Sequence, residues 1–148
     1  MVAVNDQQKH VLADKVIARF GEDLTGLTFA MWGLAFKPDT DDMREAPSVV
    51  IANRLIERGA KIVAYDPEAM EEARHSLGDT ITYAKRASDA LDGADALILV
   101  TEWSEFRNPV WEKVAEALKQ PVVFDGRNIY DPAQVREAGL EYSGIGRR

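Results

Sequence analysis

The pattern of hydrophobic and polar positions along this chain alternates between a helical and an extended period. Apolar residues recur at helical spacing over residues 5–20, and Gly21 ends this first pattern. Further helices are predicted at residues 47–58, 68–77, 88–91, 109–118 and 132–138, and strands at residues 28–33, 61–65, 81–84, 96–100, 122–124 and 140–142. Strands that alternate with helices of this length predict βαβ units and a parallel sheet with helices on both faces.

The residues Ala96–Val100 are apolar without alternation, which is typical of a central strand buried on both faces. The expected fold is therefore α/β: a doubly wound, mostly parallel, Rossmann-like sheet with one leading helix. No repeat or flexible linker interrupts the pattern, so we expect residues 1–22 to form the leading helix and residues 23–148 one domain. A chain of 148 residues, 46% of them hydrophobic, is long enough to bury one sizeable core.

The formal net charge of −7 at pH 7 would repel a polyanion over most of the surface. We therefore expect neither nucleic acid nor a membrane as the main partner, and any anionic ligand must be held by locally placed cations. A run of about 18 or more apolar residues is absent, and the N-terminus has neither a basic n-region nor an apolar h-region. These features predict a cytoplasmic protein.

The chain contains no cysteine, which excludes a disulfide, a thiolate metal site and a cysteine nucleophile within it. His10 and His75 fall in helical patterns without the spacing of metal ligands. The sequence also shows neither a Walker loop nor a nucleophile elbow with an accompanying Ser-His-Asp order. We therefore predict no catalytic residue and no metal site in this chain.

The loop after the first strand carries charges where a dinucleotide-binding fold would carry a glycine fingerprint. Only Gly33 of such a fingerprint is present, and Lys37 and Arg44 follow it. Their spacing allows both cations to point toward one diphosphate, the ammonium as a point charge and the guanidinium as a bidentate fork. The alternative is a solvated loop in which nearby carboxylates pair with them, namely Asp39, Asp41, Asp42 and Glu45.

Three more residues follow predicted strands, each with two interpretations. Asp66 stands where a dinucleotide fold holds a ribose, but before a proline it is also a good turn former and helix cap. Trp103 can stack on a base or sugar, or it can cover the sheet as core together with Phe106. Arg127, after Gly126, is either presented to a ligand by a short rigid loop or is a surface arginine beside an Asp-Gly turn.

Four motifs, taken together and in this order, resemble one known family. They are Gly33–Ser48, Tyr65-Asp66-Pro67, Thr101-Glu102-Trp103 and Asp125-Gly126-Arg127-Asn128. The family is that of the UDP-glucose/GDP-mannose dehydrogenases. The residues of the motifs are most similar to those of the C-terminal UDP-binding domain in the UDP-glucose 6-dehydrogenase branch of that family. Residues 4–8 also look like the end of the long central helix of that family, which would make residues 1–22 the end of a connecting helix.

The resemblance implies an activity and a set of contacts. The family oxidises the C6 alcohol of the sugar to a carboxylate in two NAD-dependent hydride transfers, through a thiohemiacetal on a cysteine. By this likeness Phe36 and Lys37 line the UDP-sugar site, and Arg127 also reaches the substrate. Arg44 contacts NAD across the cleft between domains.

The chain departs from the family pattern in what it lacks. The glycine-rich NAD loop, the nucleophilic cysteine and the lysine and acid that manage protons belong to the N-terminal half of the family. The resemblance therefore implies a partner in the form of an N-terminal dehydrogenase domain and no turnover by this chain alone. Separately, a truncated amphipathic first helix would expose apolar residues, so we expect a homo-oligomer formed through the leading helix. The alternatives are a stand-alone nucleotide-binding or oligomerisation module, or the equivalent domain of a GDP-mannose or UDP-N-acetylmannosamine dehydrogenase.

Overall fold

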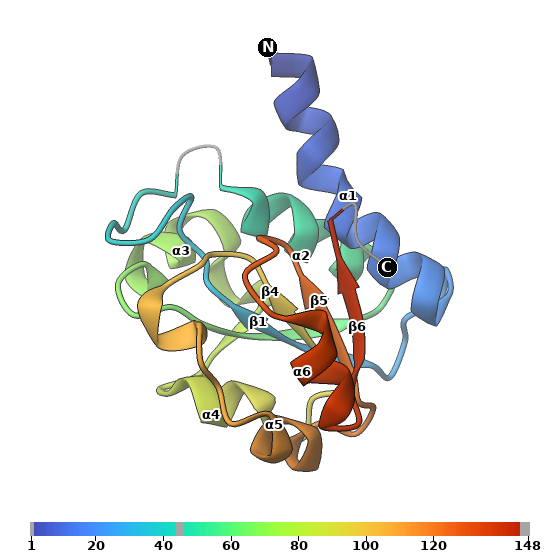
Figure 1. The fold of residues 1–148 in the computed structure, drawn as a ribbon. Coiled ribbons are helices and arrows are strands. Elements are labelled where there is room, and N and C mark those ends of the chain that lie inside the picture. The colour runs from blue at the N-terminus through green and yellow to red at the C-terminus, as the bar shows by residue number, and fades with distance from the viewer. Residues whose placement is uncertain (1, 44–45, 146–148) are drawn as a thin grey trace.

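The computed structural model describes residues 2–43 and 46–145, with side chains from residue 10 onward. Six parallel strands form one sheet in the order β3-β2-β1-β4-β5-β6 (Figure 1). The strands are β1 (Thr28–Trp32), β2 (Lys61–Tyr65), β3 (Thr82–Tyr83), β4 (Ala96–Leu99), β5 (Val122–Asp125) and β6 (Glu141–Gly144). This order reverses between β1 and β4, which is the point where open α/β sheets form their ligand crevice.

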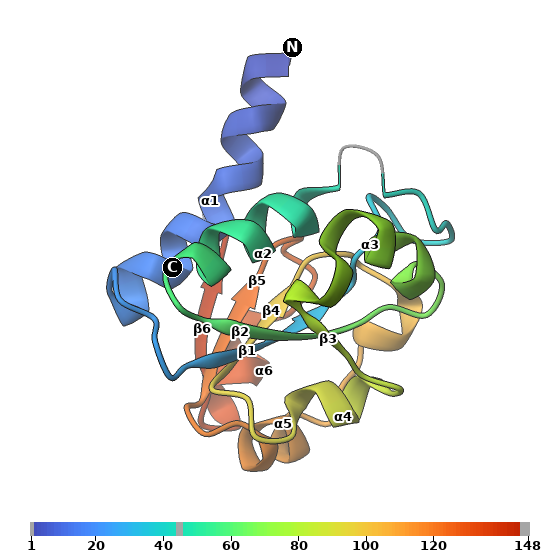
Figure 2. The same ribbon diagram turned by 180° about the vertical axis from the view of Figure 1, so that it is seen from behind.

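Helices cover both faces of the sheet. They are α1 (Val2–Phe20), α2 (Pro47–Glu57), α3 (Met70–Leu77), α4 (Ala87–Leu91), α5 (Trp111–Ala117) and α6 (Pro132–Glu137), with short 3₁₀ segments η1 (Gly78–Thr80) and η2 (Ser104–Phe106). Figure 1 and its reverse view, Figure 2, place α1, α2 and α3 on one face of the sheet and α4, α5 and α6 on the other. The predicted α/β, doubly wound, Rossmann-like class is confirmed.

Alternating residues of the four inner strands, β2, β1, β4 and β5, pack into two separate cores. On β1, Phe29 and Met31 face the α1–α3 side, whereas Ala30 and Trp32 face the α4–α6 side. The same division continues on β4, whose four residues are all buried. The continuous apolar run of this strand is thus explained by burial on both faces, as the sequence predicted.

The predicted elements are all present, and their ends differ by a few residues. The third helix begins at Met70 instead of 68, because residues 67–69 form a turn. The helix predicted at 109–118 is confined to Trp111–Ala117. The segment η1 was not predicted, since three residues are too short for a periodic signal.

Residues in the second half of the leading helix α1 pack on the domain. Leu12, Ala13, Val16 and Ile17 are buried in the same core as the sheet, and the first half of the helix projects beyond the domain in Figure 1. The Arg19 guanidinium forms a bidentate pair with the Glu141 carboxylate, with N–O distances of 2.8 and 2.9 Å. The domain boundary after residue 22 stays a prediction.

None of the helices in the described part of the chain has both the length and the apolar character needed to cross a membrane.

Candidate functional site

The loops that follow β1, β4 and β5 meet at one edge of the sheet, because these strands are parallel neighbours. Gly33 lies so close to Thr101 that a Cβ built on the glycine would stand 2.5 Å from the Thr101 Cβ. Gly33 also has a φ of 96°, which other residues adopt only with strain. The buried Thr101 hydroxyl donates a hydrogen bond to the Ala35 carbonyl at 2.6 Å. The single glycine of this turn is therefore required by the packing of two loops.

Arg127 joins three of the strand-end loops. Its Nε donates a hydrogen bond to the Val100 carbonyl oxygen at 3.0 Å, and its Nη2 donates one to the Phe36 carbonyl oxygen at 2.7 Å. The Glu102 carboxylate lies 3.6 Å from Nε. Gly126 makes this placement possible, since a Cβ there would meet the Leu99 carbonyl oxygen at 2.6 Å. The Arg127 side chain is 30% exposed, so it is not closed off from solvent.

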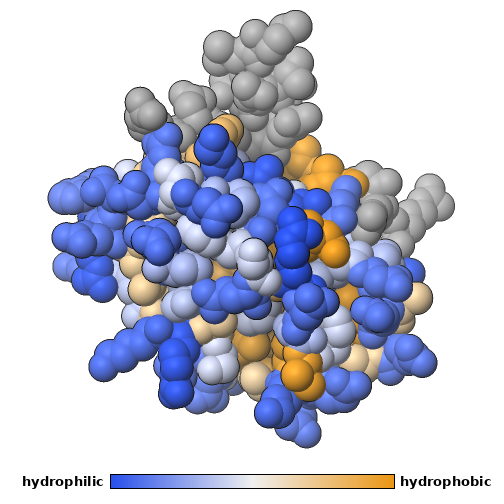
Figure 3. All heavy atoms as spheres, turned by 60° about the vertical axis from the view of Figure 1, so that its left-hand side comes forward, coloured by the Kyte–Doolittle hydropathy of each residue, from blue (hydrophilic) through white to orange (hydrophobic). Residues whose placement is uncertain are grey.

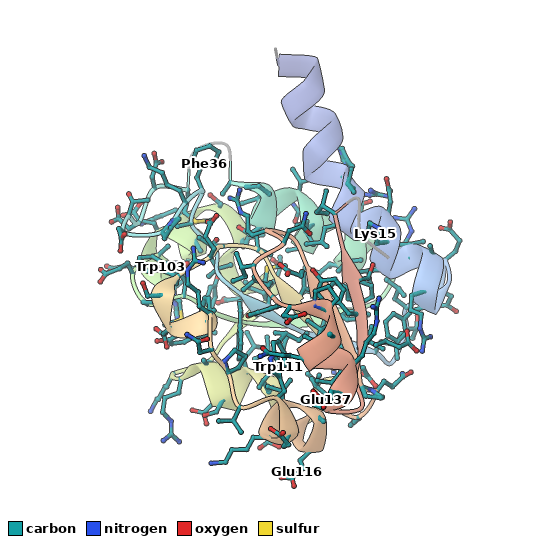
Figure 4. The ribbon with its side chains drawn as sticks, in the orientation of Figure 1. Lys15, Phe36, Trp103, Trp111, Glu116 and Glu137 are labelled. Carbon is teal, nitrogen blue, oxygen red and sulfur yellow. The ribbon has the colours of Figure 1, made fainter. Side chains whose placement is uncertain are left out.

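Phe36 and Lys37 project from the loop that Arg127 holds. Phe36 is 42% exposed, an unusual state for a large apolar side chain in this domain, and Figure 4 shows it at the outer edge of the loop. Its backbone N–H donates to the Asp42 carbonyl oxygen at 2.9 Å and closes the loop. Lys37 is exposed and forms no hydrogen bond or ion pair with any other described residue. The structure thus brings Phe36 and Arg127 together, and Lys37, which no described residue pairs with, is the next residue in the chain.

Arg44, the predicted cofactor contact, lies outside the residues that the structure describes.

Asp66, at the end of β2, is completely buried and satisfies five N–H donors. Its Oδ2 accepts from the amides of Leu34 and Ala35 and from the indole of Trp103, at 2.7, 3.1 and 3.0 Å. Its Oδ1 accepts from the amides of Glu68 and Ala69, both at 2.8 Å. The structure supports the turn interpretation of Asp66, because its carboxylate binds two amides of the turn at residues 67–69. The cap is not observed: the N-cap position of α3 is Ala69, without a side-chain cap bond. The carboxylate has no exposed surface to offer a ribose.

Trp103 and Phe106 belong to the core. Trp103 is 7% exposed and its indole is committed to Asp66, so it is not available as a stacking platform. Phe106 is fully buried and stacks on Trp32 with ring centroids 5.0 Å apart. Figure 4 shows Trp103 further inside the molecule than Phe36. The core interpretation of this loop is therefore the correct one.

Asp125 is a second buried carboxylate at the carboxyl ends of the strands, which the sequence analysis named only as part of a motif and of an Asp-Gly turn. It accepts hydrogen bonds from the amides of Arg127 and Tyr130 and from the hydroxyl of Tyr142, at distances of 3.1, 2.9 and 2.9 Å. Burial, together with the Asp125 charge, raises the pKa of Tyr130 above its ordinary value. The signal in the sequence was an acid directly after an apolar strand and before glycine. Asp125 fixes the turn from which Arg127 projects.

An open hollow of about 580 Å³ lies beside this edge, between the 40–43 segment and α3. It is lined by Thr40, Asp41, Asp42, Met43, Glu72, His75 and Ser76. Figure 3 turns this side of the molecule forward and shows a mostly hydrophilic face with small separate hydrophobic areas. Phe36, Lys37 and Arg127 do not line the hollow, so the candidate site lies at the strand ends and not in it.

Residues 30–132 match the sequence model of a protein family described as the UDP-glucose/GDP-mannose dehydrogenase family, UDP binding domain. This chain belongs to that family. The resemblance predicted from the motifs at 33–48, 65–67, 101–103 and 125–128 is confirmed, and all four motifs lie within the matched range.

Relatives and solved structures of the family agree. The chain is 41% identical over 148 residues to UDP-glucose 6-dehydrogenase YwqF of Bacillus subtilis, covering 100% of this chain and 33% of the relative. It is 44% identical over 156 residues to UDP-glucose 6-dehydrogenase of Pseudomonas aeruginosa, covering 98% of this chain and 33% of that protein. The structure of a UDP-glucose dehydrogenase from Pyrobaculum islandicum superposes with a TM-score of 0.80 at 35% identity, over 97% of this chain and 30% of the other. This chain therefore spans about a third of the length of the curated relatives it matches.

Proposed function

We propose that this chain is the nucleotide-sugar-binding part of an NAD-dependent UDP-glucose 6-dehydrogenase. The observation that carries the proposal is a cluster at the carboxyl ends of the strands. It consists of exposed Phe36, Lys37, with which no described residue pairs, and the partly exposed side chain of Arg127, whose guanidinium donates to the Phe36 carbonyl oxygen at 2.7 Å. Family membership assigns UDP binding to this domain as its class of function. The roles of the three residues in holding the substrate are part of the proposal.

The charge of the protein explains why such a cluster is needed. A diphosphate approaching a chain of net charge −7 meets repulsion at most of the surface, so binding requires cations that are not already neutralised. Lys37 meets this condition because no described carboxylate pairs with it. Arg127 meets it in part: Nε and Nη2 hold the loops and the Glu102 carboxylate lies 3.6 Å from Nε, but Nη1 has no hydrogen-bond partner among the described residues. We propose Phe36 as an apolar surface against the nucleotide sugar.

UDP-glucose is the proposed substrate because the relatives at 41% and 44% identity are named UDP-glucose 6-dehydrogenases. GDP-mannose dehydrogenase from Pseudomonas aeruginosa is 19% identical with a TM-score of 0.64, and this likeness shows the fold alone. The equivalent domain of a GDP-mannose dehydrogenase therefore has weaker support than the UDP-glucose branch.

NAD does not fit the turn after β1. A dinucleotide site needs free backbone amides at this turn and a free acid at the end of β2. Here the Leu34 and Ala35 amides donate to Asp66, and Asp66 is buried with five donors. We therefore propose that NAD is held mainly by an N-terminal dehydrogenase domain, with Arg44 as a contact from this chain. The chain itself holds and orients the nucleotide sugar and is proposed to be inactive alone.

The leading helix has a proposed role in assembly. Because the first half of α1 projects beyond the domain, we propose residues 1–22 as the end of a connecting helix through which copies pair. Deleting residues 1–9 leaves the buried Leu12 and Val16 in place and tests this contact by sedimentation without opening the core. A mass unchanged by the deletion would argue against pairing through this helix.

We also propose a cytoplasmic location, in keeping with the absence of cysteine.

Calorimetric titration with UDP tests the binding proposal. Lys37→Ala and Arg127→Ala each remove a charge-assisted contact worth about 1.5–3 kcal/mol. The Kd for UDP should therefore rise by about 10- to 150-fold in each variant. Lys113→Ala, on α5, and Arg86→Ala, beside α4, remove exposed cations on the face of the sheet that α4, α5 and α6 cover, away from the proposed site. These two controls should bind UDP as the wild type does. Wild-type preference for NAD over UDP would instead support a nucleotide-sensing module.

A further inference from the structure

Asp66 differs from the other carboxylates in the described part of the chain in how many loops it holds. Its five donors come from three segments that are distant in sequence: the turn after β1, the turn before α3 and the loop after β4. The carboxylate is 0% exposed, so water does not compete for these hydrogen bonds. Each bond joins a charged acceptor to an N–H group, which is the stronger class of hydrogen bond in proteins.

The turn after β1 leads directly to the proposed ligand residues. Ala35 is held on both sides, its N–H by Asp66 at 3.1 Å and its carbonyl oxygen by the Thr101 hydroxyl at 2.6 Å. Phe36 is the next residue and gives its carbonyl oxygen to Arg127, and Lys37 follows. Only one residue therefore separates the last Asp66 contact from Lys37.

We propose that Asp66 is a positioning residue of the nucleotide-sugar site: its buried carboxylate fixes the turn that aims Phe36 and Lys37. This inference rests on the proposed function. The carboxylate also takes the place of a ligand anion at that turn, because it accepts from the two consecutive amides of Leu34 and Ala35. A domain of this fold that bound a dinucleotide here would offer those amides to the pyrophosphate. Asp66 thus excludes a phosphate from the turn after β1 and leaves the cations at Lys37 and Arg127 to hold it.

The test compares two buried carboxylates at opposite ends of the strands: Asp66 follows β2, and Asp95 precedes β4. Asp66→Asn keeps the shape of the side chain but turns an NH₂ group against at least two N–H donors, whichever way the amide is oriented. Asp95→Asn is the matched control: Asp95 is also buried, and it accepts from the Thr28 amide at 2.8 Å at the start of β1. Both variants should unfold at lower temperature than the wild type, so the thermal midpoint does not discriminate between them.

Affinity for UDP and amide exchange do discriminate. In Asp66→Asn the Kd for UDP should rise by about tenfold or more, as expected for the loss of a charged anchor. Amide hydrogen exchange at residues 34–37 should accelerate in the same variant. In Asp95→Asn the Kd should stay within about twofold of the wild type, and exchange at residues 34–37 should be unchanged. The reason is that Asp95 binds the Thr28 amide at the start of β1, whereas residues 34–37 follow the end of that strand.

A milder variant keeps the inference testable if Asp66→Asn does not fold. Trp103→Phe removes one of the five donors and retains an aromatic ring in the core. It should raise the Kd for UDP by about two- to tenfold, the effect of one neutral donor to a charged acceptor. A folded Asp66→Asn or Trp103→Phe variant with wild-type Kd and wild-type exchange would overturn the inference.

The outcomes separate this inference from the proposed function. If the wild type binds UDP and Lys37→Ala weakens binding, the proposed function stands whatever Asp66→Asn does. If the wild type does not bind UDP, the proposed function fails and Asp66 has no ligand site to position. Exchange at residues 34–37 still decides in that case whether the carboxylate holds the turn.

Discussion

Gly33→Ala should destabilise the domain far more than a glycine replacement at a surface turn. The new Cβ would stand 2.5 Å from the Thr101 Cβ and 2.6 Å from its backbone nitrogen, which is closer than real Cβ contacts allow. Neither atom belongs to the end of a flexible side chain, so the loop after β1 or the loop after β4 has to move. The movement would pull Ala35 away from the Thr101 hydroxyl, a bond of 2.6 Å.

The magnitude has two parts. A non-glycine residue at a φ of 96° costs about 1–2 kcal/mol in backbone strain. Overpacking against the buried Thr101 adds about 1–3 kcal/mol. The expected loss of about 2–5 kcal/mol is a large part of the roughly 5–15 kcal/mol that holds an ordinary domain together. Urea unfolding followed by circular dichroism measures it directly, as a lower midpoint at unchanged slope.

Gly93→Ala is the matched control for this prediction. Gly93 has a φ of 80°, but a Cβ built there meets nothing within 4 Å. It should therefore lose only the strain of about 1–2 kcal/mol. If Gly33→Ala is no more destabilising than Gly93→Ala, the close approach to Thr101 does not constrain the site, and the explanation given for Gly33 is wrong.

Two further predictions concern groups near the ends of the strands. Burial, with smaller contributions from Glu105 and Asp66, raises the pKa of Tyr65 to about 12 from its usual value near 10. The unfolded chain loses this proton first, so the part of the stability due to Tyr65 should be present below about pH 10 and fall between about pH 10 and 12, and Tyr65→Phe should remove that part of the pH dependence. Asn128, with a φ of 55°, exchanges two hydrogen bonds with the backbone of Ile145 at 2.7 and 2.8 Å. Asn128→Gly keeps the backbone relaxed and should still lose about 1–3 kcal/mol in urea unfolding, whereas a loss near zero would show that the side-chain bonds contribute nothing.

The periodicity of the sequence was sufficient for the fold class. An apolar run such as Ala96–Val100 and a helical pattern such as that of residues 47–58 are local signals, and each produced the expected element. The parallel sheet followed from their alternation. The order of the elements along the chain placed the motifs after strands, where ligands bind in such sheets. The residues of the four motifs were enough to identify the family.

Periodicity was not sufficient for the individual residues of the site. Asp66 had two chemically reasonable interpretations, and so did Trp103, since each residue type occurs both in ligand sites and in the interior. The structure decided between them because Asp66 and Trp103, 37 residues apart, hydrogen bond to each other inside the protein. No local pattern encodes such a pair.

The sequence alone therefore determined the elements, the fold class and the family of this chain, because these depend on short-range periodicity and on motifs read in order. Tertiary structure alone decided which side chains hold the loops at the carboxyl ends of the strands by hydrogen bonds and which side chains face solvent. Arg127 reaches Phe36 across 91 residues, and that contact exists only because the strand order sets β1 beside β4 and β4 beside β5. Contacts of this range arise from the packing of strands whose order is not written in any one segment.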